Sequence, residues 1–285
     1  MTPDERLVFL MAERLASGDI VVQGIATPIV FAAFLLARAT HAADLQCLFT
    51  IGNTYCQSPS GSLSIEFLEE YTTIQSLMRL GMLDIHCDVV PALKVKEFLR
   101  PAQVDGSGNT NNVAIGTWER PLVRLPGAVG IPDVVSFNPQ VYLYVTRHDR
   151  RTLVEQIDFC SGVGVGPRSE ALQAFGDAVR GPRELITPDA VFRLTSEGPQ
   201  LSQVIPGRTC EQIREMTGFT FQIADEWQPM SDPSADEMAL LRQDIDPLGI
   251  RKLETTSGMD RIRLIRRIVN QERTRKVTGS FHNTV

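Results

Sequence analysis

Histidine and cysteine are the residues of this 285-residue chain that could bind a metal ion or attack an electrophile. The four histidines (His41, His86, His148 and His282) have no partner at the helical i, i+3 or i, i+4 spacing, and no HExxH motif occurs. The five cysteines are scattered and form no CxxC pair, which argues against a zinc ribbon or a redox dithiol. The sequence therefore predicts no metal site.

A glycine-rich run, Ser161 to Pro167, is the next candidate, because the backbone N–H groups of glycine loops can bind phosphate. Its spacing is GxGxG rather than GxGxxG, and Pro167 removes a backbone donor where a helix should begin. A structural glycine loop is therefore favoured over a dinucleotide site. No GxxxxGK[ST] or GxSxG motif occurs, so the chain has neither a P-loop nor the elbow of a serine hydrolase.

The elements that must position any such chemistry belong to an ordinary globular protein. Hydrophobic residues make up 43% of the chain and charged residues 22%, with a net charge of −6. This acidic balance excludes a broad nucleic-acid-binding or anionic-membrane-binding surface. The longest apolar stretch, Pro28 to Ala37, is about half a membrane span, and the first residues lack the order of a signal peptide. We expect a cytoplasmic protein with neither a nucleic-acid nor a membrane partner.

The first fifty residues predict the order helix, strand, helix, strand, which is typical of a parallel α/β sheet. Apolar periodicity predicts a helix over Asp4–Ala16, and the β-branched run Ile20–Gly24 predicts a buried strand. A second helix opens at Thr27-Pro28 and ends before His41, since proline favours the first helical position. Gln46–Ile51 predicts the next strand.

Weaker signals cover the rest of the chain, and Lys94–Gln103 is ambiguous. We expect helices over 65–83, 210–217 and 236–246, strands over 84–90 and 141–145, a hairpin over 186–194, loops over 105–112 and 121–133, and a surface segment over 161–183. Alternation along the strand over 84–90 would send His86 and Cys87 to opposite faces. The segment Asp260–Lys276 has seven basic and two acidic residues, and Ile262, Ile265 and Val269 could form an apolar stripe. It is interpreted as a solvated terminal helix or a subunit-docking element.

Three segments rise above this background when taken together. They are Ile20–Pro28, a strand followed by glycine, a turn and a proline-led helix; Gln103–Asn111, which reads QVDxxGNTN; and Arg124–Gly130, which reads RLPGAVG. In this order and at this spacing they resemble the B subunit of the glutaconate type in family I CoA-transferases, from roughly Glu5 to Gly249. The resemblance implies an α/β fold with a Rossmann-like, mostly parallel sheet flanked by helices. It also implies a B-subunit-like domain over 1–249, followed by a basic helical extension over 250–285.

The family's catalytic glutamate follows the second strand in a Glu-x-Gly context, where it attacks acyl-CoA to form a mixed anhydride and then a glutamyl–CoA thioester. Here the matching stretch reads Phe49-Thr-Ile-Gly-Asn53. Gly52 matches the motif glycine, which puts Thr50 at the glutamate position, and no acidic residue occurs between Asp44 and Glu66. A threonine hydroxyl needs an adjacent base and cannot form the exchangeable anhydride.

The resemblance implies a site built from loops at strand ends. Candidate residues for binding substrate and CoA are Gly24, Thr27, Thr50, Gly52, Gln103, Asn109, Asn111, Gly127 and Gly130. Candidate catalytic residues are Asn53, Tyr55 and Cys56. Cys56 would be a nucleophile if a dipole or cation lowered its pKa, and Tyr55 could donate to a developing enolate; a buried inert thiol and a packed aromatic ring are the alternatives. For the glycines and asparagines, tight turns and loop-internal hydrogen bonds are the alternatives.

These observations lead us to expect the B subunit of a heteromeric enzyme, paired with an A subunit as a heterodimer or heterotetramer and acting on an acyl-CoA thioester. Relatives without the glutamate include a 3-methylglutaconyl-CoA decarboxylase and a hydrolase of a steroid-derived ring, so we expect decarboxylation or hydrolysis of a C–C or thioester bond. Coenzyme A would enter as part of the substrate, with no permanently bound cofactor. The alternatives are a true transferase whose nucleophile comes from the partner, a non-catalytic CoA-binding or scaffold subunit, and an unrelated α/β sugar-phosphate binder or isomerase.

Overall fold

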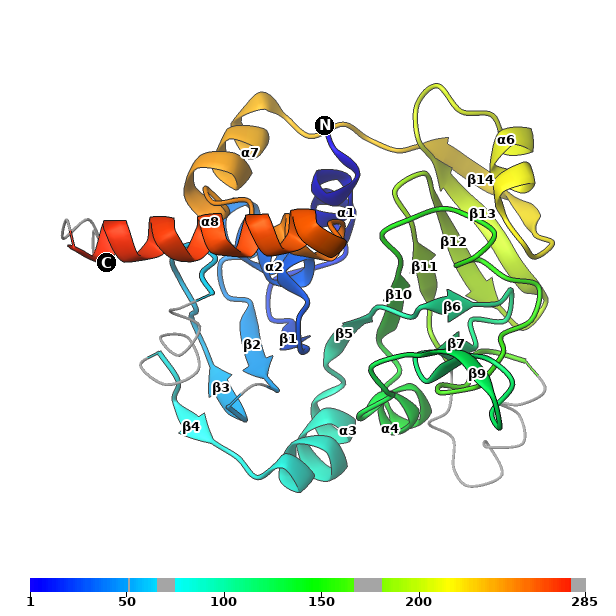
Figure 1. Cartoon of the computed structure of the whole chain (residues 1–285), viewed down its shortest axis with the longest axis horizontal. Coiled ribbons are helices and arrows are strands. Elements are labelled where there is room, and N and C mark those ends of the chain that lie inside the picture. The colour runs from blue at the N-terminus through cyan, green and yellow to red at the C-terminus, as the bar shows by residue number, and fades with distance from the viewer. Residues whose placement is uncertain (51, 66–74, 167–180, 278–285) are drawn as a thin grey trace. The chain divides into compact units, whose positions relative to one another are not determined.

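The computed structural model of the chain describes residues 1–50, 52–65, 75–166 and 181–277 (Figure 1). Its contacts divide the chain into two compact units, of which unit 1 comprises residues 1–80 and 233–285 and unit 2 comprises residues 81–232. The boundary predicted at Gly249 follows the resemblance rather than these contacts, and it stays a prediction.

Unit 1 joins the first and last parts of the chain. Its described elements are α1 (Pro3–Ala12), β1 (Ile20–Gln23), α2 (Pro28–Thr40), β2 (Gln46–Phe49), β3 (Thr54–Cys56), β4 (Met78–Arg79), α7 (Ala235–Leu240), the π-helix η3 (Leu241–Ile245), the 3-10 helix η4 (Ile250–Glu254) and α8 (Gly258–Val277). Strands β1 and β2 are parallel, whereas β3 and β4 add to the sheet in antiparallel pairs. The predicted order of helix, strand, helix and strand is confirmed for α1, β1, α2 and β2.

Helices α1 and α2 form where the sequence supplies both a start signal and apolar residues. Thr2 and Glu5 form a capping box at α1, in which the Thr2 N–H donates to Glu5 Oε2 over 2.8 Å. Pro28 begins α2, and all residues from 29 to 37 are buried. Phe31 of α2 meets Phe49 of β2 edge to face at 5.5 Å between ring centroids. Packing of α2 on the sheet thus covers the face that carries Phe49.

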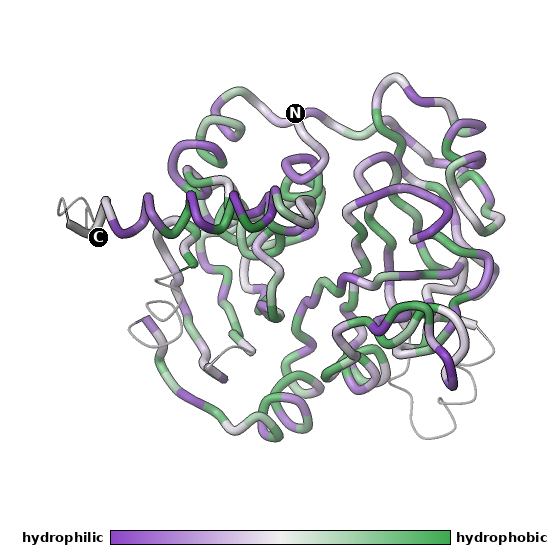
Figure 2. Tube along the Cα trace, viewed as in Figure 1, coloured by the Kyte–Doolittle hydropathy of each residue, from purple (hydrophilic) through white to green (hydrophobic). Residues whose placement is uncertain are grey.

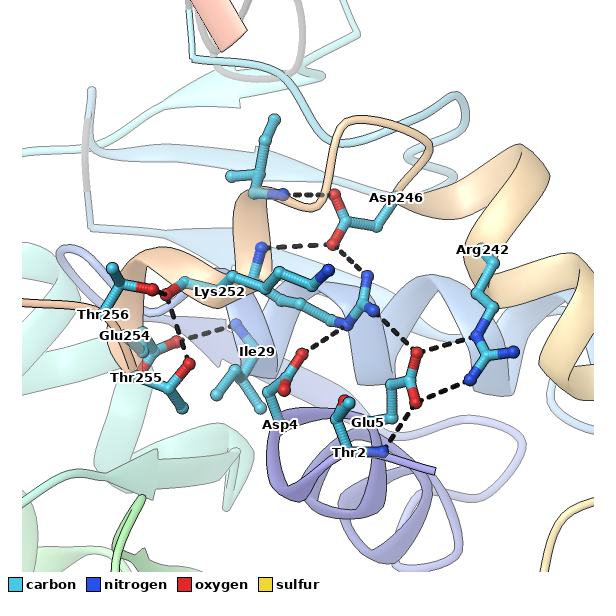
Figure 3. A network of polar contacts seen from close by, with 12 residues as sticks. Thr2, Asp4, Glu5, Ile29, Arg242, Asp246, Lys252, Glu254, Thr255 and Thr256 are labelled. Atoms are coloured by element: carbon cyan, nitrogen blue, oxygen red, sulfur yellow. Dashed lines mark hydrogen bonds and ion pairs between the residues drawn. The ribbon is translucent and has the colours of Figure 1, made fainter. Parts of the chain in front are cut away.

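The C-terminal segment is fastened to unit 1 by a buried arginine (Figure 3). Arg251 is 3% exposed and forms ion pairs with Asp4 and Glu5 at 2.8 Å and with Asp246 at 2.7 Å. Arg242 adds a bidentate contact to Glu5. Burial opposes the charged form of Glu5, but the hydrogen bonds from Arg242 and Thr2, with the charge of Arg251, lower its pKa to about 2. The ends of unit 1 are therefore held together by ionised groups.

The predicted C-terminal helix is confirmed as α8, although its apolar stripe lies elsewhere. Ile268 is fully buried and Ile265 and Val269 are half-buried, but Ile262 is 42% exposed. Figure 2 shows hydrophilic and hydrophobic residues alternating along this helix, as expected for one that packs on one side. The buried Glu272 accepts a hydrogen bond from the Ile65 N–H, which pins the segment after β3.

Unit 2 is built from one continuous stretch of chain. Its described elements are the π-helix η2 (Asp84–Val89), α3 (Val90–Leu93), β5 (Lys96–Leu99), β6 (Gln103–Val104), β7 (Thr110–Asn111), β8 (Ala114–Gly116), β9 (Pro121–Arg124), α4 (Ile131–Phe137), β10 (Val141–Tyr144), β11 (Glu184–Ile186), β12 (Ala190–Thr195), β13 (Gly198–Val204), α6 (Cys210–Met216) and β14 (Gln222–Pro229). Six strands lie in the order β14-β13-β12-β11-β10-β5. The β10 pairings with β5 and β11 are parallel, as is β13 with β14, whereas β12 pairs antiparallel with β11 and β13. Phe192 anchors the core and meets Phe219 and Phe221 edge to face.

The strand predicted over 84–90 is wrong, because this segment forms η2 and the start of α3. Its buried side chains, Ile85 and Val90, are five residues apart and do not alternate, and the Asp84 carboxylate accepts a hydrogen bond from the Gly81 N–H at the helix start. The helix predicted over 65–83 lies partly outside the described residues, and it is wrong at Met78–Arg79, where β4 pairs with β3.

Several further predictions meet the structure directly. Strand β10, the β11–β12 hairpin, α6 and α7 confirm their predictions, and the ambiguous 94–103 segment contains β5 and the start of β6. The loop predicted over 121–133 is wrong in part, since β9 pairs there with β8 and α4 begins at Ile131. The loop predicted over 105–112 contains β7. Most of the segment over 161–183 lies outside the described residues.

Two searches of the described residues bear on function. No helix among them is long and apolar enough to cross a membrane. No group of three or more histidine, cysteine, aspartate or glutamate side chains among them could hold a metal ion.

Candidate functional site

The carboxyl end of β1 is organised by Gln23, a residue that the sequence reasoning did not single out. Its side-chain amide donates to Thr27 Oγ1 at 2.9 Å, to the Thr27 carbonyl at 3.1 Å and to the Gly24 carbonyl at 3.3 Å. The Thr27 hydroxyl donates in turn to the Gly24 carbonyl. The predicted residues Gly24 and Thr27 are thus held in one tight turn. The signal that could have found Gln23 is a polar residue closing an otherwise apolar strand.

The turn after β2 meets the same strand end. The Thr50 N–H and its hydroxyl both donate to the Gln23 carbonyl, at 3.2 and 3.0 Å. Gly52 and Asn53 follow with φ of 82° and 52°, a left-handed conformation that glycine and asparagine tolerate. The structure therefore brings Thr50 to Gly24 and Thr27, and the hydroxyl at the predicted glutamate position is engaged with the backbone.

Tyr55 and Cys56 do not act on the same side of the sheet. Register pairs Cys56 with Cys47 and Tyr55 with Leu48, and neighbouring residues of a strand face opposite sides. The Tyr55 hydroxyl donates to Gln46 Oε1, and the Cys56 thiol donates to the Gln75 carbonyl at 3.1 Å. Burial raises the pKa of both groups, so neither is activated for ionisation in this unit. The condition for a Cys56 thiolate is not met here.

In unit 2, Gln103 and Asn111 join two loops. The Asn111 amide donates to Gln103 Oε1 at 2.7 Å and to the Ala114 carbonyl at 2.6 Å, and Asn111 Oδ1 accepts from the Val113 N–H at 3.0 Å. Gln103 donates to Asp158 Oδ2 at 3.0 Å. Asn111 is fully buried. These contacts support the loop-internal interpretation of the asparagine, because its amide is used within the protein.

Asn109 is held in a similar way. Its amide donates to both oxygens of Asp105, at 3.0 and 2.9 Å, and its carbonyl oxygen accepts from the Gly164 N–H at 2.9 Å. A Cβ at Gly164 would lie 2.0 Å from the Ser107 carbonyl oxygen, so this contact requires glycine. The glycine-rich run and the QVDxxGNTN segment are therefore one packed structure. Asp105 and Asp158 complete it, and sequence reasoning gave neither a role.

The third predicted segment forms an open backbone loop. The Gly127 N–H donates to the Asn112 carbonyl, and Gly127 has a φ of 111° with no heavy atom within 4 Å of a Cβ. Val129 has a φ of 45°, which is rare for a β-branched residue, and it is 70% exposed. Such strain is common where a loop binds a ligand. Gly127 and Gly130 thus keep their candidacy for binding, as do the backbone groups between them.

Known proteins place these features in a family. No family model matches the chain. The B subunit of 3-oxoadipate CoA-transferase from Pseudomonas knackmussii is 29% identical over 241 residues, 84% of this chain and 91% of that protein. The B subunit of glutaconate CoA-transferase from Acidaminococcus fermentans is 23% identical, over 86% of this chain and 93% of that protein. The IpdB subunit of a cholesterol ring-cleaving hydrolase from Mycobacterium tuberculosis is 31% identical over 54% of this chain and 62% of that protein.

Solved structures agree. A variant of the decarboxylase AibA/AibB matches with a TM-score of 0.72 and 29% identity, over 89% of this chain and 98% of that one. Glutaconate CoA-transferase from Acidaminococcus fermentans matches in fold, with a TM-score of 0.75 and 18% identity over 90% of this chain and 98% of that one. The protein is therefore an α/β protein with the CoA-transferase fold, as predicted.

The chain belongs to the CoA-transferase family of enzymes and is a homologue of its B subunits. This assignment confirms the resemblance drawn from the three segments. It also removes the alternative of an unrelated sugar-phosphate-binding protein.

Proposed function

We propose that the chain is the B subunit of a heteromeric enzyme that acts on an acyl-CoA thioester without a glutamyl–CoA intermediate. The reaction is decarboxylation, or hydrolysis of a C–C or thioester bond. A homologue of the A subunit completes the enzyme as a heterodimer or heterotetramer, coenzyme A enters as part of the substrate, and the complex works in the cytoplasm.

The observation that carries this proposal is the turn after β2. Thr50 stands at the position that the family resemblance assigns to the glutamate, and its hydroxyl donates to the Gln23 carbonyl at 3.0 Å. No acidic residue occurs between Asp44 and Glu66. A hydroxyl already committed to a carbonyl, with no base beside it in this turn, is a poor nucleophile. The names of the matched decarboxylase AibA/AibB and cholesterol ring-cleaving hydrolase support a chemistry other than CoA transfer.

Both of these reactions need an electron sink at the thioester more than they need a nucleophile on this chain. When a carboxylate β or vinylogous to a thioester leaves as CO₂, its electron pair moves into a thioester enolate. Backbone N–H groups aimed at the thioester oxygen stabilise that charge. The loops at Gly24, Gly52 and Gly127–Gly130 are the candidates on this chain for supplying them.

The test is covalent trapping during turnover of the complex reconstituted with its A subunit. Acyl-CoA is supplied with acetate as acceptor, the mixture is quenched with hydroxylamine or borohydride, and both chains are read by mass spectrometry. Products are separated into acetyl-CoA, CO₂ and free CoA. We expect CO₂ or free CoA with no modified glutamate. A glutamyl adduct on either chain, together with acetyl-CoA, would establish the true transferase instead.

A second test separates a catalytic subunit from a scaffold. Asn53→Ala, Tyr55→Phe and Cys56→Ala are assayed in the reconstituted complex, with Ser136→Ala on the exposed face of α4 as the control. A catalytic role for this turn predicts a loss of kcat in at least one of the three variants. Three fully active variants would favour a scaffold subunit whose partner holds the chemistry.

A further inference from the structure

His86 lies against the third predicted segment of unit 2. A Cβ built on Gly130 would lie 3.3 Å from His86 Cε1, 3.4 Å from Nδ1 and 3.8 Å from Nε2. The nitrogen-bearing edge of the imidazole therefore faces the end of the Gly127–Gly130 loop. Glycine is the residue that lets the ring approach without displacement, since the contact would be tighter than most Cβ contacts.

The His86 ring differs from the other histidines that the structure describes. His148 uses both nitrogens, at 2.8 Å to Thr187 and 3.0 Å to Thr217, and burial lowers its pKa to about 4. His41 also uses both, at 2.9 Å to Thr40 and 3.1 Å to the Leu15 carbonyl. His86 Nδ1 is buried and has no hydrogen-bond partner among the described residues. A buried polar atom left unpaired costs about 1–3 kcal/mol, so its retention calls for an explanation.

The backbone on both sides of the contact is unusual as well. His86 lies inside the π-helix η2, a geometry that is rare and frequent at functional sites. Across the contact, Val129 holds its left-handed conformation. Leu83 and Val129 are 76% and 70% exposed, so the chain leaves large apolar side chains uncovered beside both partners in sequence. Such a surface is available to a ligand.

We propose that His86 transfers the proton in the reaction at the thioester held by the Gly127–Gly130 loop. This inference rests on the proposed function, because it assumes that the loop binds an acyl-CoA. A reaction without the glutamate still has to move a proton, and histidine is the side chain whose charge changes between pH 5 and 8.

The proton balance differs between the two proposed reactions. In decarboxylation the C–C bond to the carboxylate breaks, CO₂ leaves, and its electron pair enters the thioester enolate; imidazolium then protonates the enolate carbon and regains a proton from water. In hydrolysis neutral imidazole takes a proton from the attacking water as its oxygen bonds to the carbonyl carbon, and returns that proton to the leaving group. His86 is an acid in the first case and a base in the second.

The charged groups on the elements around His86 set the background of its titration. Asp84 and Asp88 lie on η2 itself, and the Asp84 carboxylate is engaged with the Gly81 N–H. The first turn of α4 carries Asp133, and Lys94 caps α3. Cys87 is an exposed thiol next in sequence. Asp133→Asn is therefore the variant that shows how far a neighbouring charge shapes the pH profile.

The first test is the pH profile of kcat in the reconstituted complex for His86→Gln, with His41→Gln as the matched control. His86→Gln is expected to lower kcat by about 10²–10⁴-fold and to abolish one limb of the profile, whereas the control keeps both. Imidazole added to His86→Ala should restore part of the rate, which a structural role would not allow. A kcat within tenfold of the wild type, or an unchanged profile, overturns the proposal.

The second test does not need turnover. The complex is labelled with [ε1-¹³C]histidine and titrated with S-ethyl-CoA, a thioether that cannot react. The His86 resonance, assigned from its absence in His86→Gln, is expected to shift on binding while that of His41 does not. Binding without a His86 shift overturns the placement of His86 at the site. An inactive complex that binds S-ethyl-CoA and shifts His86 would refute the proposed reaction but support the position of the residue.

Discussion

Arg251→Met removes the buried charge that joins the two ends of unit 1 and keeps much of the side-chain volume. In the native protein one guanidinium faces the carboxylates of Asp4, Glu5 and Asp246 at 2.7–2.8 Å, and it is 3% exposed. In the variant Glu5 retains Arg242, but Asp246 loses its ion pair while remaining buried. A buried carboxylate left without its partner is strongly unfavourable.

We expect Arg251→Met to lower the free energy of unfolding by about 3–5 kcal/mol, the usual range when one partner of a buried ion pair is removed. At about 2–4 °C per kcal/mol for a unit of this size, the melting temperature should fall by roughly 10 °C. The deficit should also shrink as the pH falls from 7 towards 4. Burial already raises the pKa of Asp246, with Arg251 opposing, so without Arg251 this carboxyl is neutralised at a still higher pH.

The two units report separately on this change. Both tryptophans, Trp118 and Trp227, lie in unit 2, whereas α1, α2 and α8 belong to unit 1. Urea unfolding is followed by far-UV circular dichroism and by tryptophan fluorescence. The midpoint by circular dichroism should fall more than the midpoint by fluorescence, because the lost contacts lie in unit 1.

The control is Arg263→Met on α8 in the same unit, whose side chain is 71% exposed and pairs with Asp260 at 2.9 Å. An exposed pair contributes at most ~1 kcal/mol, so this variant should unfold almost as the wild type does. If Arg251→Met lost no more than Arg263→Met, or if its deficit grew as the pH fell, the account of Arg251 as a buried counter-charge would be refuted.

Three further outcomes are expected in unit 2. Burial raises the pKa of Glu97 to about 8, so the folded state holds it neutral while the unfolded chain ionises it above about 4.5; Glu97→Gln should therefore stabilise unit 2 by about 3 kcal/mol at pH 7 and flatten the loss of stability between pH 4.5 and 8 in pH-dependent urea unfolding. Asn111→Ala leaves the buried groups of Gln103 and Val113 unpaired and should destabilise unit 2 by about 3 kcal/mol, read from tryptophan fluorescence; an unchanged midpoint would contradict the network described here. Gly164→Ala forces a Cβ to 2.0 Å from the Ser107 carbonyl and should lower the melting temperature by roughly 10 °C in a thermal scan, whereas a native-like scan would show that the two loops can separate at little cost.

The parts of the fold that were predictable are those in which local pattern and tertiary packing agree. The helix and strand pairs of the first fifty residues have start signals and apolar runs that match their buried faces. The 84–90 segment has β-branched residues and few polar interruptions, which favour a strand, but Ile85 and Val90 are buried at a spacing that only a wide helical turn provides. A period-2 expectation cannot anticipate that spacing.

The candidate site was predictable as segments and not as contacts. The sequence singled out Asn109 and Gly130, but the partners that decide their environment, Gly164 and His86, are 55 and 44 residues away. His86 was considered only as a metal ligand on a strand, and the structure places it in a helix instead. Contacts of this range depend on the folded chain and leave no periodic signal in the sequence.

The discontinuity of unit 1 has a consequence for biosynthesis. Unit 2 is one uninterrupted stretch, so all of its residues have been made before the C-terminal part of unit 1 leaves the ribosome. Domains generally fold as units during synthesis. The first eighty residues, however, hold the carboxylates of Asp4 and Glu5 without the counter-charges of Arg242 and Arg251 until these two arginines emerge. A pause or truncation before residue 251 should therefore release a chain whose second unit is folded and whose first remains a substrate for chaperones.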